Sequence, residues 1–301
     1  MRSLSKKQII GAVLVLIAMS VAVFVFVTRE KVREEKTTPL EKPSEVVVGS
    51  VEPIPVQKVI GTSVQGRGIL AYTYGTGSTT LMFVGGIHGG YEWNSVLLSY
   101  ELIDYLEANP ESVPHNMTII VVPSANPDGV YEVIGVEGRF ALTDVPEKTK
   151  LGLGRFNAHS VDLNRNFDCK WKPESKWRGN TVSAGTAPFS EPESQAIRDI
   201  ITEQQPEAVV FLHSQSNAVY ASECESGILH ETRTVMSLYA EASGYPAVDS
   251  FDAYEITGDA EGWLASINIP AITVELSTHE TTEWTRNLAG IKALFAYYDS
   301  K

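Results

Sequence analysis

The stretch LMFVGGIHGGYEWNSVLLSYELIDYLEA, residues 81–108, decides the fold. It opens with the apolar run Leu81–Val84, which is typical of a buried strand, and continues through a glycine-rich turn. From Asn94 to Ala108 the apolar side chains recur with a period close to 3.6 residues, which predicts a helix. A strand, a tight turn and a helix in this order indicate an α/β domain.

Other segments repeat this alternation. Further buried strands are expected at Met117–Val122, Ala208–Leu212 and Ala271–Leu276, and further helices from about Ser190 to Gln205, from Glu231 to Ala242 and from Asn287 to Tyr298. Ser190-Glu191-Pro192-Glu193 is interpreted as a capping box with an early proline. The pattern predicts an α/β fold with a mixed, largely parallel central sheet and helices on both faces.

The N-terminal segment differs from the rest of the chain. Residues 9–27 carry no charge and follow three basic residues, which favours an uncleaved transmembrane signal-anchor behind a cytoplasmic tail of residues 1–8. A cleaved signal peptide is the main alternative, and a buried globular helix is a weaker one. Residues 28–50, rich in Glu, Lys, Thr and Pro, predict an exposed linker. One folded domain is then expected over residues 51–301.

This organisation predicts a single-pass protein of the cell membrane whose folded domain lies outside the cytoplasm, or a secreted protein if the anchor is cut. The two cysteines, Cys169 and Cys224, are an even number in a chain that we expect to be exported. A disulfide and two buried thiols are both compatible with that count. The chain has 24 basic and 37 acidic side chains and a formal net charge of −13, so no nucleic-acid partner is expected.

Candidate site residues lie where the predicted strands end. His88 follows the first strand, His213 follows the strand Ala208–Leu212, and Glu275 lies near the end of the last strand. Ligands of α/β sheets bind outside the carboxyl ends of the strands. Glu92 shares the glycine-rich turn with His88, so a His–Glu–His set suited to catalytic zinc is available. The alternative is that His88 only bonds within its turn while Glu92 caps the helix.

Six segments together resemble the zinc metallocarboxypeptidases of the carboxypeptidase A type, and most closely their bacterial murein-peptide amidase and endopeptidase relatives. They occur in the family's order between about residues 80 and 276. The segments are Gly86-Ile87-His88-Gly89, Asn126-Pro127-Asp128-Gly129, Val161-Asp162-Leu163-Asn164-Arg165-Asn166-Phe167, Pro188-Phe189-Ser190-Glu191-Pro192-Glu193, Phe211-Leu212-His213-Ser214 and Thr273-Val274-Glu275-Leu276.

The resemblance implies a catalytic domain that binds one Zn²⁺ per chain through His88, Glu92 and His213. It implies that Glu275 accepts a proton from the attacking water and passes it to the leaving amine. Arg155 matches the arginine that stabilises the negative oxygen of the transition state in the bacterial relatives, and Arg139 is its rival for that role.

The resemblance also implies how substrate is held. Asn164 and Arg165 match the pair that grips the terminal carboxylate of the substrate, and Tyr254 lies near the position of a mobile tyrosine that contacts substrate. The implied reaction is hydrolysis of a peptide or amide bond near a free C-terminal carboxylate, and the hypothesised substrates are peptidoglycan stem peptides. Acids in the segment from Gly258 to Trp263 would favour a basic side chain, although Asp259 or Glu261 could equally cap a helix that begins near Ala260.

One feature departs from the family pattern. The first two ligands are usually separated by two residues, whereas three separate His88 from Glu92. We expect a local bulge to absorb the extra residue. His279 is a candidate neighbour of the site, while Trp171 and Trp177 are interpreted as loop anchors. Two alternative functions remain open: a zinc-dependent deacylase of the aspartoacylase type, and a non-catalytic binding protein that kept the cleft.

Overall fold

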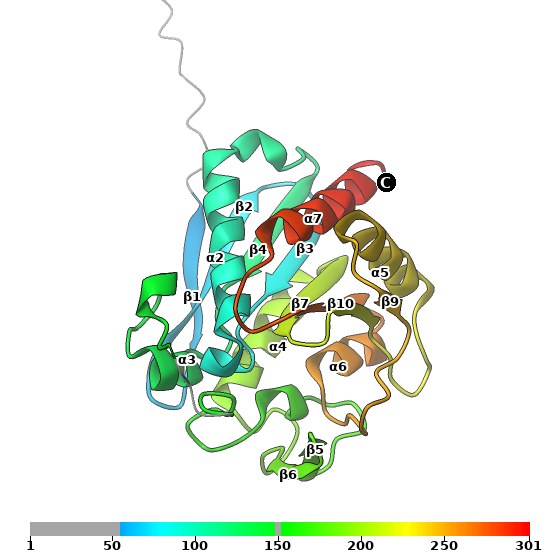
Figure 1. Ribbon diagram of the computed structural model, residues 1–301. Helices are drawn as coiled ribbons and strands as arrows, with labels where there is room; N and C mark the ends of the chain where they lie inside the picture. Colours follow the sequence, from blue (N-terminus) through cyan, green and yellow to red (C-terminus); the bar gives the residue numbers. More distant parts are fainter. Residues whose placement is uncertain (1–54, 148–151) are drawn as a thin grey trace, which may run out of the picture. The chain divides into compact units, whose positions relative to one another are not determined.

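A mixed eight-stranded sheet forms the centre of the domain (Figure 1). The computed structural model describes residues 55–147 and 152–301. The strands follow the order β1-β2-β4-β3-β7-β10-β8-β9. Their bounds are Val56–Thr62 for β1, Gly68–Gly75 for β2, Thr79–Val84 for β3, Met117–Val122 for β4, Ala208–Ser214 for β7, Ala218–Ala221 for β8, Ala247–Val248 for β9 and Ala271–Leu276 for β10. A separate hairpin pairs β5 (Glu174–Trp177) with β6 (Asn180–Ser183).

The four predicted strands are the parallel centre of this sheet. β4, β3, β7 and β10 run parallel to their neighbours, whereas β2 and β8 pair with them in the antiparallel direction. All seven residues of β7 are buried, as expected for a strand covered on both faces. The predicted mixed, largely parallel sheet is therefore confirmed.

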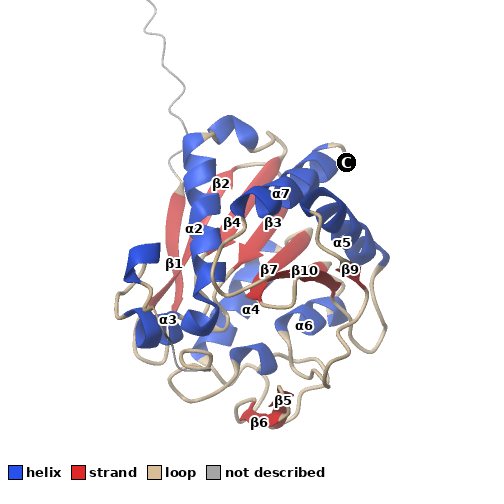
Figure 2. Cartoon of the chain, in the orientation of Figure 1, coloured by secondary structure: helices blue, strands red, loops and turns tan. Residues whose placement is uncertain are grey.

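Helices cover both faces of the sheet, as predicted (Figure 2). One apolar core joins the sheet to α2, α5 and α7, and a second core joins it to α4 and α6. The helices are α2 (Trp93–Ala108), α3 (Pro127–Ile134), α4 (Pro192–Gln204), α5 (His230–Ser243), α6 (Ala260–Ser266) and α7 (Trp284–Asp299), and single 3₁₀ turns lie at Gly89–Glu92 (η1), Pro110–Ser112 (η2), Leu142–Asp144 (η3) and Leu163–Arg165 (η4). Gly244 ends α5 in a left-handed conformation, φ 73°, which only glycine adopts at little cost.

The predicted capping box at the start of α4 is wrong. The N-cap residue is Glu191, and its side chain makes no capping hydrogen bond. The hydroxyl of Ser190 instead accepts a hydrogen bond from Asn166, and the Glu193 carboxylate accepts one from the backbone N–H of Val64. The side chains of Ser190 and Glu193 therefore bind residues outside the helix and do not cap its N-terminus.

A disulfide joins Cys169 to Cys224, which decides between the two possibilities left open by the cysteine count. The predicted tail, membrane anchor and linker, residues 1–50, lie outside the described residues. Within 55–147 and 152–301, no helix combines the length and apolar character needed to cross a bilayer.

Candidate active site

The candidate site lies at the carboxyl ends of β3, β7 and β10. β7 and β10 run in parallel register, which sets His213 beside Glu275, and the turn that follows β3 carries His88 and Glu92. A cleft of about 540 Å³ opens at this edge and is lined by all four of these side chains. The predicted convergence at the strand ends is therefore what the structure shows.

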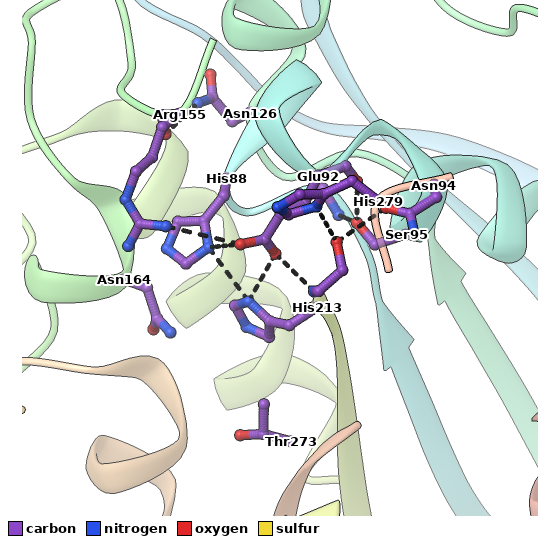
Figure 3. A network of polar contacts seen from close by, with 12 residues as sticks. His88, Glu92, Asn94, Ser95, Asn126, Arg155, Asn164, His213, Thr273 and His279 are labelled. Carbon is purple, nitrogen blue, oxygen red and sulfur yellow. Dashed lines mark hydrogen bonds and ion pairs between the residues drawn. The ribbon is translucent and has the colours of Figure 1, made fainter. Parts of the chain in front are cut away.

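His88, Glu92 and His213 converge on one point (Figure 3). The Nδ1 atoms of His88 and His213 lie 2.7 Å from Oε1 and 3.0 Å from Oε2 of Glu92, and 3.2 Å from each other. All three side chains are buried. Two imidazole nitrogens and one carboxylate, aimed at the same place in an open cleft, are the donor set of a catalytic zinc site. The residues present therefore fit the ion.

The extra residue between His88 and Glu92 is wound into a 3₁₀ turn, η1, rather than a strand bulge. Gly89 adopts φ 49° there, and a Cβ atom on it would lie 2.4 Å from the carbonyl oxygen of Gly154, so the turn requires glycine. The turn brings Glu92 back beside His88. It also places Tyr91 in the cleft, where its ring packs against Trp177 with 5.4 Å between centroids.

A second carboxylate lies behind each histidine. Nε2 of His88 is 3.3 Å from Oδ1 of Asp162, and Nε2 of His213 is 3.3 Å from Oε1 of Glu261. Burial alone would raise the pKa of Asp162, but Arg155 and His88 hold it far below its ordinary value. Carboxylates in this position orient ligand histidines. The sequence reasoning assigned no role to Asp162, although it lies in a quoted family segment two residues before Asn164.

Glu275 lines the cleft and carries one oxygen without a hydrogen-bond partner among the described residues. This oxygen, Oε2, is buried. In the metal-free protein, burial and the nearby Glu92 carboxylate raise the pKa of Glu275 to about 7. A carboxyl group with a pKa near neutrality is suited both to accept and to return a proton.

Arg155 lines the cleft, whereas Arg139 does not. The Arg155 guanidinium is buried, and its Nη1 atom lies 3.6 Å from Oε1 of Glu92. It also lies 4.6 Å from the centroid of the Trp177 ring. Arg139 instead pairs with Asp104 on the exposed surface, so the rival candidate is wrong. Trp177 lines the cleft and does more than anchor a loop.

Asn164 and Arg165 lie on η4 and line the cleft. The side-chain oxygen of Asn164 accepts a hydrogen bond of 2.8 Å from the backbone N–H of Ala260. Arg165 donates to the carbonyls of Asn164 and Lys176, while its buried Nε has no partner among the described residues. Tyr254 lines the same cleft. The structure thus brings together all the predicted substrate-binding side chains.

The two acids of the specificity segment have different surroundings. Asp259 caps α6 by accepting a 2.7 Å hydrogen bond from the N–H of Gly262, and it lines the cleft. Burial, with the neighbouring Glu261 carboxylate, raises the pKa of Asp259 to about 6. Glu261 is nearly inaccessible, at 3% exposed, and accepts a hydrogen bond from Thr273.

His279 reaches the site through Ser214. Its Nδ1 atom lies 2.7 Å from the hydroxyl of Ser214, whose backbone N–H donates to Oε2 of Glu92. The His279 ring packs against Tyr91, with 4.7 Å between centroids. The sequence suggested His279 as a neighbour of the site, and the structure places it in contact with Ser214, the residue that follows His213.

The chain belongs to the zinc carboxypeptidase family, whose model matches residues 52–292. The family places it among the zinc metallopeptidases, and the resemblance read from the six segments is confirmed.

Two curated bacterial proteins are similar to it. Gamma-D-glutamyl-L-diamino acid endopeptidase 1 of Lysinibacillus sphaericus is 27% identical over 241 residues, which cover 73% of this chain and 60% of that protein. Murein peptide amidase A of Escherichia coli K12 is 34% identical over 151 residues, covering 46% of this chain and 58% of that protein. The chain thus spans about three fifths of the length of these relatives.

Solved structures show the same fold. The murein-tripeptide amidase of Escherichia coli O157 matches with a TM-score of 0.57 at 25% identity, covering 82% of this chain and 93% of that one. Bovine thrombin-activatable fibrinolysis inhibitor matches with a TM-score of 0.62 at 20% identity, covering 82% of this chain and 89% of that one.

Proposed function

We propose that the protein hydrolyses a peptide or amide bond next to a free C-terminal carboxylate. The observation that carries the proposal is the unpartnered Oε2 atom of Glu275, a residue that lines the same cleft as the His–Glu–His set. Zinc, when bound by His88, Glu92 and His213, would supply a Lewis acid and an acidified water. Glu275 accepts a proton from the attacking water and returns it to the leaving amine.

The two arginines then act at different points of the substrate. Arg155 lies close to Glu92, so its guanidinium stabilises the oxygen that becomes negative as the carbonyl is attacked. Arg165 lies beside Asn164 on η4, and both side chains line the cleft. Arg165 and Asn164 together bind the terminal carboxylate and align the scissile bond with Glu275.

The substrate class is a peptide that ends in a diamino acid, as in peptidoglycan stem peptides. Two observations support it. The names of the two bacterial relatives specify a γ-D-glutamyl-L-diamino acid bond and murein peptides. Asp259, an acid in the cleft, offers a partner for a terminal ammonium group. The membership of the family favours this reaction over the deacylase alternative.

We also propose that residues 9–27 hold the chain in the cell membrane with the catalytic domain outside the cytoplasm, because this uncharged run follows a basic tail. Membrane fractionation and N-terminal sequencing of the mature protein test this. Retention of residues 1–27 in the membrane fraction supports an anchor, whereas a mature chain that starts after them shows a cleaved signal.

Digestion of muropeptides tests the enzymatic proposal. Purified full-length protein loaded with zinc is expected to release the terminal diamino acid, whereas Glu275→Gln should bind zinc equally well and lose about 10²–10⁴-fold in kcat. Absence of cleavage of both muropeptides and simple dipeptide substrates by zinc-loaded wild type would favour the non-catalytic alternative. Cleavage of acylated amino acids alone would favour the deacylase.

A further inference from the structure

Glu261 is a buried acid that the proposed reaction does not use. It lies in the first turn of α6 and lines the cleft, although its side chain is only 4% exposed. Its neighbour Asp259 is the cleft acid assigned above to substrate. Glu261 is thus a second, almost inaccessible carboxylate of the cleft without an assigned role.

The contacts of Glu261 point to the metal centre. Its Oε1 atom lies 3.3 Å from Nε2 of His213 and accepts a 2.9 Å hydrogen bond from the hydroxyl of Thr273. Nε2 of His213 makes no hydrogen bond to any described residue, and the Glu261 carboxylate at 3.3 Å is its ion-pair partner. The opposite ring nitrogen, Nδ1, faces Glu92. Glu261 and the metal position therefore lie on opposite sides of the same imidazole ring.

The hydroxyl of Thr273 holds Glu261 in this position. Thr273 and Glu275 are two residues apart on β10, so their side chains point to the same face of the sheet. The strand that carries the general base thus also supports Glu261. Since Thr273 and His213 both approach Oε1, this oxygen is already occupied by the protein.

We propose that Glu261 is a positioning residue of the metal centre, which orients His213 and keeps its Nδ1 lone pair directed at the zinc. A neutral imidazole has one N–H, and a carboxylate at Nε2 favours the tautomer with the proton there, leaving Nδ1 free to bind metal. The carboxylate also makes the ring a stronger donor. Asp162 occupies the equivalent place behind His88.

One consequence is that α6 serves both metal and substrate. The N–H of Ala260 fixes Asn164, Asp259 faces the cleft, and Glu261 supports His213. The three residues are consecutive, so a change in the position of this helix end alters the metal centre and the substrate pocket together.

Zinc affinity of the full-length apoprotein tests the proposal without any substrate, so its failure is distinguishable from failure of the proposed function. We expect Glu261→Gln to weaken zinc binding about 10- to 100-fold in competition with a chelator. Thr273→Val, which removes only the supporting hydroxyl, should weaken it less, and Asp104→Asn, at an exposed carboxylate, should leave it unchanged. The visible spectrum of the cobalt-loaded protein should shift in Glu261→Gln and not in Asp104→Asn.

Thermal unfolding of each apoprotein checks that the variants fold. Equal zinc affinity of wild type and a folded Glu261→Gln overturns the proposal, and a simultaneous loss of preference for basic substrates would make Glu261 a specificity residue instead. If Glu261→Gln does not fold, Thr273→Val decides, and an unchanged zinc affinity in that variant overturns the proposal.

Discussion

Arg155 and Asp162 form a buried ion pair in which Nε and Nη2 of the arginine, at 3.1 and 2.9 Å, both donate to Oδ2 of the aspartate. The other oxygen of Asp162 lies 3.3 Å from Nε2 of His88. One carboxylate therefore holds both the arginine that we propose faces the developing charge and a histidine of the metal set. The proposed oxyanion site and the metal site are consequently built as one unit.

Asp162→Asn should lower both the stability of the protein and its activity. Removing one member of a buried ion pair leaves an uncompensated charge and typically costs about 3–5 kcal/mol. We expect a loss of this size in the free energy of unfolding, measured in urea, together with a lower kcat. The exposed pair of Arg139 with Asp104 provides the control, because Asp104→Asn should cost less than about 1 kcal/mol. Equal effects of the two substitutions would contradict the assignment.

Arg165→Lys should weaken substrate binding while leaving the chemical step intact. A lysine keeps the charge but cannot present two parallel N–H groups to a carboxylate. Since hydrogen bonds to charged groups contribute roughly 1.5–3 kcal/mol, KM should rise about 10- to 100-fold. Steady-state kinetics at saturating zinc measure this, with Arg233→Lys on the surface as the matched control. A fall in kcat at constant KM would assign Arg165 to the chemistry instead.

The preference for a basic terminal side chain should depend on pH. The pKa of Asp259 is raised to about 6, so its carboxyl group is neutral below that pH and charged above it. The ratio of kcat/KM for a substrate ending in a diamino acid to that for one ending in alanine should therefore rise between about pH 5 and 7. In Asp259→Asn the ratio should be lower and independent of pH. A pH dependence that survives this substitution would point to another acid.

The disulfide should contribute to stability. Cys169 and Cys224 are 55 residues apart in sequence, and closing a loop of that length stabilises the folded state by about 4 kcal/mol in the chain-entropy model. The double variant Cys169→Ser/Cys224→Ser should lose a comparable free energy of unfolding without reductant. In reductant, the free energy of unfolding of the wild type should fall toward that of the variant, whereas the value for the variant should not change. Equal stability of oxidised wild type and variant would refute the expectation.

The central strands and the metal set could be predicted from sequence because each depends on a local signal. A short apolar run such as Met117–Val122 can be buried only as a strand or a core helix, and its length favours the strand. The carboxyl ends of parallel strands meet at one edge, so His213 and Glu275 were expected at the same edge, and the pairing of β7 with β10 in the structure makes them neighbours.

The supporting residues could not be predicted in the same way. Glu261 was left between a helix cap and a substrate contact, because its distance from His213 depends on how α6 packs against β10. The prediction of a capping box was wrong for the same reason. Asn166 binds the side chain of Ser190 and Val64 binds that of Glu193, and both partners are far from α4 in sequence. Tertiary partners overrode local patterns at these positions.

The hydrogen bond from the backbone N–H of Ala260 to the side-chain oxygen of Asn164 determines which end of the Asn164 amide is free to bind substrate. A side-chain amide can both donate and accept, but here its oxygen is occupied by a backbone N–H, so only its NH₂ group remains to face the substrate. Arg165 lies beside it, so these two side chains offer hydrogen-bond donors to the cleft. If they hold the terminal carboxylate as proposed, a peptide that ends in a carboxamide would bring its own NH₂ group against them, and we expect this pair to discriminate a free terminus from a blocked one by repulsion as well as by attraction.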